Sequence, residues 1–448
     1  MTLPGRLASV AARHGTPAEI ARAVLVGLLA GILAVLFRSA IDGIDRLRLA
    51  LLAAGHGRSD WGWAIVPLLG LAAGCLIGWL TVRYAPDAPG SGIPHIEGML
   101  RGVNSMPWRS LLPVKFVGGA LGIGGGFSLG LEGPTVQMGA CAGQAVAEAT
   151  CRDDASEAQN LVASGAGAGL AAVFNAPLAG FIFTLEELRR PLSVASYSGT
   201  MVAVIAAVMV ARVFAGQLPY FEVRGYPPPP LESFPLVLLI GVVAGLLGVA
   251  FNRALLNLHR LSSGIRVVPR WSVPGFVLAA VGVVAWWLPD ATGGGHAAAQ
   301  QLLAGAYPAG VGALIVLLAA KFAVTVTSYA SGTPGGIFAP ILVLGTITGV
   351  IVGHVGEWLL PAVAPTPTAF AVLGMAAVFT ASVRAPLTGI TLIIEMTGEQ
   401  SQLFALCAVC LVAFLVAEAL GDRPIYEALL EDDLKRRHAA PSSTTLAR

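Results

Sequence analysis

Long apolar segments, broken by Gly and Pro rather than by runs of charge, follow one another along most of this chain. Ten of them are long enough to cross or deeply enter a bilayer. They lie near residues 20–37, 63–82, 111–130, 195–214, 234–251, 273–288, 309–330, 337–353, 368–381 and 402–420. Other segments, such as 161–174, are too short to span upright and predict broken or re-entrant helices. The pattern therefore predicts an all-α polytopic membrane protein made of tilted and broken helices.

The composition supports this class and narrows the possible partners. Apolar residues make up 56% of the 448 residues, charged residues make up 12%, and the mean hydropathy is +0.77. Soluble globular domains do not reach these values. The net charge of +2, without a polybasic tail, argues against nucleic acid as a partner. The expected surroundings are therefore a lipid bilayer.

The flanking charges bear on the orientation in the membrane. Basic residues at both ends favour cytoplasmic termini, although Arg38, just after the first apolar run, weakens the count. These basic residues are Arg6, Arg13, Arg22, Lys435, Arg436 and Arg437. Heavy use of Arg over Lys, with abundant Ala and Gly, is typical of a GC-rich bacterial genome and so favours the bacterial cell inner membrane.

Nothing in the sequence calls for a metal or a cofactor. Cys407 and Cys410 have CxxC spacing, but they lie in an apolar segment without a His or acidic partner nearby. We expect them to pack helix against helix as small residues.

The chain contains an internal repeat. Lys115 is followed nineteen positions later by Pro134 in a Gly-rich stretch, and Lys321 is followed nineteen positions later by Pro340 in another. Lys occurs only once elsewhere, at residue 435, so this match is hard to assign to chance. Residues 171–174 and 376–379 both read Ala-Ala-Val-Phe and precede a similar Ala-Pro-Leu motif.

The repeat defines a domain organisation. We expect an N-terminal segment at 1–20, a first membrane repeat at 21–214, an inter-repeat loop at 215–232, a second membrane repeat at 233–426 and a C-terminal tail at 427–448. Four consecutive prolines at 227–230 mark the loop. Transporters built from repeats hold their substrate near the bilayer midplane, where helix N-termini from both halves converge.

Three Gly-rich elements stand at the entries of apolar segments, at residues 90–94, 130–134 and 335–340. Each has glycines, then a Pro suited to the first turn of a helix, then an apolar run. Such a helix start points unpaired N–H groups and the positive end of the helix dipole into the loop. Any one of them could be an ordinary helix break, but three in one chain favour an anion site that needs no full positive charge.

Two acidic features complete the candidate site. Glu132 lies inside the second Gly-rich element, where an ionisable group at membrane depth marks an ion or proton path. Its carboxylate could itself occupy the anion site and act as a gate. Glu186 and Glu187 follow a helix start at 175–177, and Glu395 is the repeat partner of Glu186. We expect Glu186 and Glu395 to be structural, held by helix-end donors or by Arg189 and Arg384, whereas Glu187 is the better proton-relay candidate.

These motifs resemble the signature elements of the CLC chloride channel and transporter family, in the expected order and spacing. The likeness runs from the first apolar run to Tyr426 and includes residues 112–116 and 175–180. It implies an inverted-repeat bundle and a homodimer with one pathway per subunit. It also implies a selectivity filter formed by Gly90, Ser91, Gly92, Ile93, Pro94, Gly130, Leu131, Glu132, Gly133, Pro134, Gly336, Ile337, Phe338, Ala339 and Pro340.

The resemblance assigns roles within this filter. It implies that Ser91 and Tyr426 bring hydroxyl donors to a chloride ion, together with the backbone N–H groups of Ile337 and Phe338. Glu132 resembles the external gating glutamate. Glu187 resembles the internal proton glutamate of many H+/Cl- antiporters.

Two positions depart from the family pattern. Leu131 stands where a basic residue usually precedes the gating glutamate, which removes a charge near the outer mouth. His95 stands where an acidic residue is common, and we expect it to be a surface or helix-cap residue rather than a pH sensor.

The sequence thus predicts transmembrane chloride transport coupled to proton counter-transport. The nearest alternative is an uncoupled CLC-type chloride channel, in which Glu187 would be a structural remnant. An intramembrane hydrolase could draw on Ser91, Ser164 or Ser331, but these serines have no convincing base within reach, so the chain is not expected to be an enzyme. A receptor or scaffold explains neither the repeat nor Glu132.

Overall fold

The computed structural model describes residues 16–56, 62–151, 154–188, 194–223, 225, 228–264, 267–308, 310–361 and 366–439. These residues form 17 α-helices with four short 3-10 turns, and their only β pairing consists of isolated bridges. The helices of the N-terminal half are α2 (Pro17–His56), α3 (Ile65–Tyr84), α4 (Ile93–Leu100), α5 (Trp108–Gly124), α6 (Glu132–Thr150), α7 (Ala155–Phe174), α8 (Pro177–Glu186) and α9 (Val194–Ala215).

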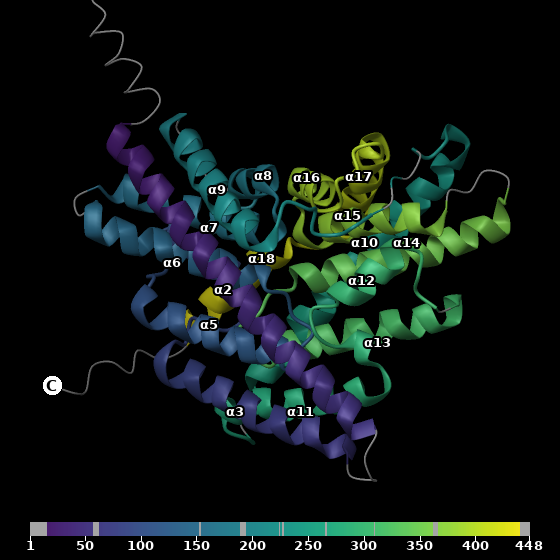
Figure 1. Cartoon of the computed structure of the whole chain (residues 1–448), viewed down its shortest axis with the longest axis horizontal. Coiled ribbons are helices and arrows are strands. Elements are labelled where there is room, and N and C mark those ends of the chain that lie inside the picture. The colour runs from purple at the N-terminus through teal and green to yellow at the C-terminus, as the bar shows by residue number, and fades with distance from the viewer. Residues whose placement is uncertain are drawn as a thin grey trace, which may run out of the picture.

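The C-terminal half repeats this alternation of long and short helices. Its helices are α10 (Phe234–Gly264), α11 (Val273–Trp287), α12 (His296–Leu303), α13 (Val311–Ala330), α14 (Phe338–Leu359), α15 (Pro367–Val383), α16 (Pro386–Thr397), α17 (Leu403–Ala419) and α18 (Ile425–Ala439). The two halves lie side by side, and α18 runs near the centre, behind the long diagonal helix α2 (Figure 1).

Only some of these helices can cross a bilayer alone. Within the described residues, seven helical segments are long and apolar enough to do so. The helices α8, α15, α16 and α17 are apolar but shorter, as expected for pieces that enter the membrane without crossing it upright. The short apolar run at 161–174 forms the wholly buried C-terminal part of α7. Of the two cysteines expected to pack between helices, Cys410 is buried, but Cys407 faces outward.

Glycine lets the central helices cross at backbone contact. A Cβ atom added to Gly139 of α6 would lie 2.1 Å from the carbonyl oxygen of Gly165 in α7. In the second half, a Cβ atom on Gly349 of α14 would lie 2.0 Å from the carbonyl oxygen of Phe370 in α15. Because lipid gives helices no hydrophobic reason to associate, close contact through small residues supplies much of the packing energy.

We therefore expect Gly349→Ala to destabilise the protein by about 1–3 kcal/mol, because the methyl group forces α14 and α15 apart. Gly312→Ala in α13 is the matched control, since a Cβ atom there meets nothing within 4 Å. Because alanine has a higher helix propensity than glycine, we expect Gly312→Ala to leave the stability unchanged or to raise it slightly. Thermal unfolding of the detergent-solubilised protein measures both, and equal midpoints for the two variants would contradict the packing argument.

Candidate functional site

The three Gly-rich loops predicted to form the site meet in the middle of the molecule. Gly130 and Gly336 exchange two backbone hydrogen bonds, each with an N···O distance of 2.7 Å. The N–H of Gly90 donates to the carbonyl of Thr333, and the N–H of Gly335 donates to the carbonyl of Gly90, each at 3.0 Å. Loops from the two halves therefore satisfy each other's backbone groups where no water is available.

Three helices begin at these loops. Helix α4 starts at Ile93, α6 at Glu132 and α14 at Phe338, and all three starting residues are buried. A Cβ atom on Gly133 would lie 2.8 Å from Ser91, so the first turn of α6 packs directly on the loop before α4. The N–H groups of a first turn have no acceptor within their own helix. Their partial positive charges thus concentrate in one buried place.

Glu132 occupies this place. Its side chain is 0% exposed, and its Oε2 accepts a hydrogen bond from the N–H of Ala339, in the first turn of α14, at 3.3 Å. In the described part of the chain, its Oε1 has no hydrogen-bond partner. A carboxylate from one half thus sits at the positive end of a helix of the other half, which is where a free anion would also bind.

Two hydroxyl groups flank the same region. The Oγ of Ser91 accepts from the N–H of Ile93 at 3.3 Å, and the phenol of Tyr329 also interacts with Ser91. The hydroxyl of Tyr426 is buried and, among the described residues, has no hydrogen-bond partner. Leaving a buried donor unpaired is costly, so the Tyr426 hydroxyl is available to a ligand.

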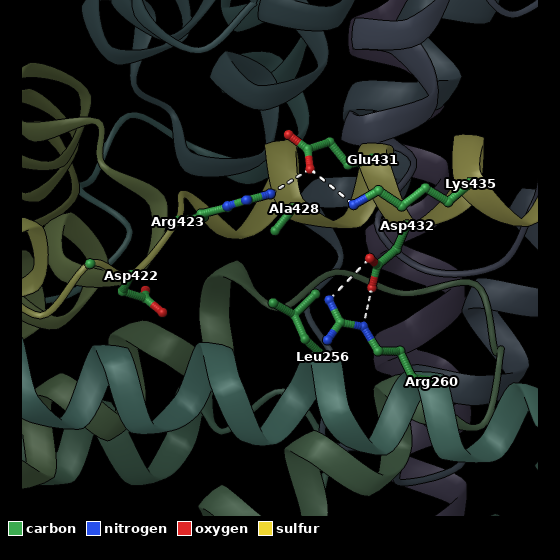
Figure 2. Close-up of a pocket in the computed structure, with 9 residues that line it drawn as sticks. Leu256, Arg260, Asp422, Arg423, Ala428, Glu431, Asp432 and Lys435 are labelled. Atoms are coloured by element: carbon green, nitrogen blue, oxygen red, sulfur yellow. Dashed lines mark hydrogen bonds and ion pairs between the residues drawn. The ribbon is translucent and has the colours of Figure 1, made fainter.

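The position of Tyr426 is fixed by the anchoring of α18. Arg260 of α10 donates to both carboxylate oxygens of Asp432, with N···O distances of 2.6 and 3.0 Å. Figure 2 shows this pair beside Glu431, which binds Arg423 and Lys435. These residues line a cavity of about 260 Å³ between α10 and α18. Five of the six charged side chains lining this cavity pair with one another, and the sixth, Asp422, pairs with Arg384 outside the lining. We therefore assign the cavity to holding α18 and not to ligand binding.

Glu187 is the second acidic residue that the sequence singles out. It caps the C-terminus of α8, where its N–H donates to the carbonyl of Phe183 at 3.0 Å, and it is partly buried. The phenol of Tyr426 is within electrostatic reach of both Glu132 and Glu187. One tyrosine is therefore linked electrostatically to both carboxylates that the sequence singles out.

Glu186 and Glu395 bind each other's helices. The carboxylate of Glu186, at the end of α8, accepts from the N–H groups of Leu387 and Thr388 in α16 at 3.1 and 2.7 Å. The carboxylate of Glu395 in α16 accepts from the N–H groups of Leu178 and Ala179 in α8 at 3.0 and 2.7 Å. The prediction that helix-end donors hold this pair is confirmed.

Of the two arginines proposed as alternative partners, the structure describes Arg384 alone. Arg384 pairs with Glu418 and Asp422 instead, and Arg189 lies outside the described residues.

Two buried lysines each bind backbone carbonyls of a loop: Lys115 binds the loop before α4, and Lys321 binds the loop before α12. The ammonium of Lys115 donates to the carbonyls of Ala88 and Gly90 at 2.8 and 2.7 Å. The ammonium of Lys321 donates to the carbonyl of Gly293 at 2.8 Å. Their repeat spacing is visible in the sequence, but this loop-holding role is not, and neither is the contact of Tyr329 with Ser91.

The expectation of a surface or helix-cap position for His95 is wrong. His95 is 9% exposed and lies inside α4, with its Nδ1 3.1 Å from the Nε2 of Gln137 in α6. Its Nε2 is 3.9 Å from the carboxylate of Asp87. Because α4 is a short helix packed on α6, even its polar residues near the N-terminus are enclosed.

A helical membrane protein with two interlocked halves, and with buried helix N-termini facing a carboxylate between them, has the architecture of an anion transporter or channel. A family model described as "Voltage gated chloride channel" matches residues 73–418. The chain belongs to this family, as the signature elements predict.

Named relatives extend the likeness over nearly the whole chain. The H(+)/Cl(-) exchange transporter ClcA of Vibrio parahaemolyticus is 38% identical over 429 residues, covering 94% of this chain and 91% of the relative. The transporter of the same name from Cronobacter sakazakii is 38% identical over 434 residues, covering 95% and 92%.

Solved structures agree on the fold. The X-ray crystal structure of a slow cyanobacterial Cl-/H+ antiporter superimposes with a TM-score of 0.90 at 34% identity, covering 95% of this chain and 100% of that one. A CLC-type fluoride/proton antiporter has a TM-score of 0.77 at 22% identity, covering 92% and 97%, which establishes the shared fold alone.

We expect the reciprocal caps formed by the carboxylates of Glu186 and Glu395 to contribute measurably to stability. Glu395→Ala leaves two N–H groups at the start of α8 uncapped and should cost about 1–2 kcal/mol. Glu395→Gln keeps one acceptor oxygen and should cost less. Thermal unfolding in detergent ranks the variants, and an alanine variant as stable as the parent would show that the cap does not matter.

Proposed function

We propose that this protein exchanges chloride for protons across a membrane. The observation that carries the proposal is the buried Glu132 carboxylate at the N-terminus of α14, where it accepts from the N–H of Ala339. The names of the ClcA relatives and of the cyanobacterial antiporter support the choice of chloride and proton as the two ions.

In this proposal, chloride binds between the two halves without meeting a full positive charge. The backbone N–H groups of Ile337 and Phe338 have no helical acceptor, and the hydroxyl groups of Ser91 and Tyr426 supply two further donors. Partial charges of this kind replace the hydration shell yet let the ion leave. The remaining residues of the filter at 90–94, 130–134 and 336–340 position these donors.

Glu132 then acts as the outer gate. As a carboxylate it competes with chloride for the N–H groups of α14, and when protonated it loses its negative charge and gives up the site. One residue thus couples the arrival of a proton to the admission of an anion. In the alternative, an uncoupled channel, the admission of chloride would not require the arrival of a proton.

Glu187 delivers protons from the inner side. It lies on a different helix from Glu132, and both carboxylates act on the phenol of Tyr426. In this proposal, the two titratable groups lie on opposite sides of the anion site and give protons a route that joins the chloride path only at Glu132.

The assembly and the location complete the proposal. We place the two membrane repeats at 21–214 and 233–426 of a homodimer in the bacterial inner membrane, with both termini in the cytoplasm. Helices α16 and α17 are only 12 and 17 residues long and expose large apolar side chains, which a second copy would cover. These side chains include Leu387, Leu403, Phe404, Leu411 and Leu415.

The test is uphill proton movement in reconstituted vesicles. A chloride gradient imposed across the membrane should drive protons against their own gradient, recorded with a pH electrode or dye. Brisk chloride flux without proton movement would replace the antiporter with the uncoupled channel, and no chloride flux would remove both.

We expect Glu132→Gln to abolish proton pumping while chloride flux persists, because the neutral amide neither carries a proton nor competes as an anion. Glu148→Gln is the matched control: this partly exposed carboxylate lies at the other end of α6, with Arg109 and Trp108. Glu187→Gln should also stop pumping and leave chloride movement largely intact. Normal coupling in either variant would remove that residue from the proton path.

We expect Ser91→Pro to raise nitrate transport relative to chloride, because it deletes a hydroxyl donor suited to a small, strongly hydrated anion. Anion flux in vesicles with paired chloride and nitrate gradients measures the ratio. Ser164→Ala is the control, since the Oγ of Ser164 bonds Thr200 in α9 and lies outside the three loops. An unchanged ratio in Ser91→Pro would exclude Ser91 from the filter.

A further inference from the structure

We infer that Arg38 of α2 is the cation that attracts chloride to the outer mouth of the site. The inference rests on the proposed chloride transport and adds a residue to it. The side chains that surround Glu132 along the chain, those of Leu131, Gly133 and Pro134, are neutral, and Leu131 is buried. The helix that carries the gate therefore brings no positive charge of its own to the entrance.

The position of Arg38 along α2 suits it to supply a positive charge at the entrance. Helix α2 begins at Pro17, so at 1.5 Å per residue Arg38 lies about 32 Å along it. That distance matches the thickness of the hydrocarbon core, about 30 Å. With the start of α2 on the cytoplasmic side, as proposed above, we place Arg38 on the outer side of the membrane. Its side chain is 37% exposed, so protein covers only part of it.

Aromatic rings connect Arg38 to the anion site. Its guanidinium lies 5.1 Å from the ring centroid of Tyr220, in cation–π contact. The Tyr220 ring packs edge-on against Phe174 with centroids 5.2 Å apart, and Phe174 packs on Phe338, the first residue of α14, at 5.8 Å. The Tyr220 phenol is within electrostatic reach of both Arg38 and Glu132.

The segment that carries Tyr220 is fixed on both sides. Before it, the side-chain amide of Asn175 donates to the carbonyl of Leu218 at 3.0 Å. After it, the N–H of Phe221 donates to the carbonyl of Met396 at 2.8 Å. The predicted inter-repeat loop thus folds back over the junction of the two halves and holds Tyr220 as a platform for the guanidinium.

The charges around Arg38 define its net effect. On its own helix, the Asp42 carboxylate is 4.0 Å away and 58% exposed, which offsets part of the positive field. Across from it, the His296 imidazole packs against Tyr220 with centroids 4.7 Å apart and feels the Arg38 charge. Arg46, two turns further along α2, donates to the carbonyl of Asp42 and points to solvent.

The experiment measures the chloride concentration that gives half-maximal flux, in proteoliposomes at low ionic strength. Arg38→Gln should raise it about three- to tenfold while the maximal flux and the proton-to-chloride ratio stay unchanged, because only the local chloride concentration falls. Arg38→Lys should retain the parent value. The shift should shrink when an inert salt is added, since salt screens an exposed charge.

Two further variants keep the test decisive if Arg38→Gln folds poorly. Asp42→Asn removes the opposing charge and should lower the half-maximal concentration, whereas Arg46→Gln should leave it near the parent value. An unchanged value in Arg38→Gln, an equal shift in Arg46→Gln, or a shift that salt does not screen would overturn the inference. Because the readout is chloride flux, a failure of proton coupling in the parent would remove the antiport proposal and leave this test intact.

Discussion

The two hydrogen bonds that Gly130 and Gly336 exchange are the interaction on which the site depends. At bilayer depth only protein can satisfy a backbone N–H or carbonyl, so a loop there must find a partner loop. Each half supplies the partner for the other. The N–H groups in the first turn of α14 take no part in this exchange and instead face Glu132. The anion site that we propose thus lies where backbone groups remain unpaired after this exchange.

Glycine makes that pairing geometrically possible. A Cβ atom on Gly133 would collide with Ser91, and one on Gly336 would lie 3.0 Å from the N of Gly133. A side chain at these positions would push apart the loops that bring the helix starts together. The same close approach between α6 and α7, and between α14 and α15, holds the surrounding helices rigid. The donors at the proposed site are therefore held in place by the surrounding backbone.

Much of this arrangement could be predicted from the sequence, because its signals are local and rare. Gly-rich turns followed by Pro, and a lone Glu inside an apolar stretch, stand out without any knowledge of the fold. The repeated Lys and Ala-Pro-Leu motifs also tell which segments occupy equivalent places. The equivalent places of Glu186 and Glu395 in the two repeats distinguish this pair from Glu187, which has no acidic counterpart.

What could not be predicted depends on segments that meet only in three dimensions. His95 looks like a surface residue, because nothing in the sequence says that Gln137 and Asp87 enclose it. The contact of Tyr329 with Ser91 joins residues more than two hundred positions apart. The segment at 216–223 has the composition of an ordinary connection, yet its backbone bonds to Met396 and Asn175 place it over the junction of the halves.

The exchanged carboxylates of Glu186 and Glu395 have a consequence for how such a chain could arise. Each half donates a carboxylate to the helix of the other and receives one in return, by the same rule that two identical subunits follow across a two-fold axis. A single half would leave its short helix uncapped, whereas two copies of that half would complete each other. The fold therefore has the geometry expected of a chain that arose by duplication of one half.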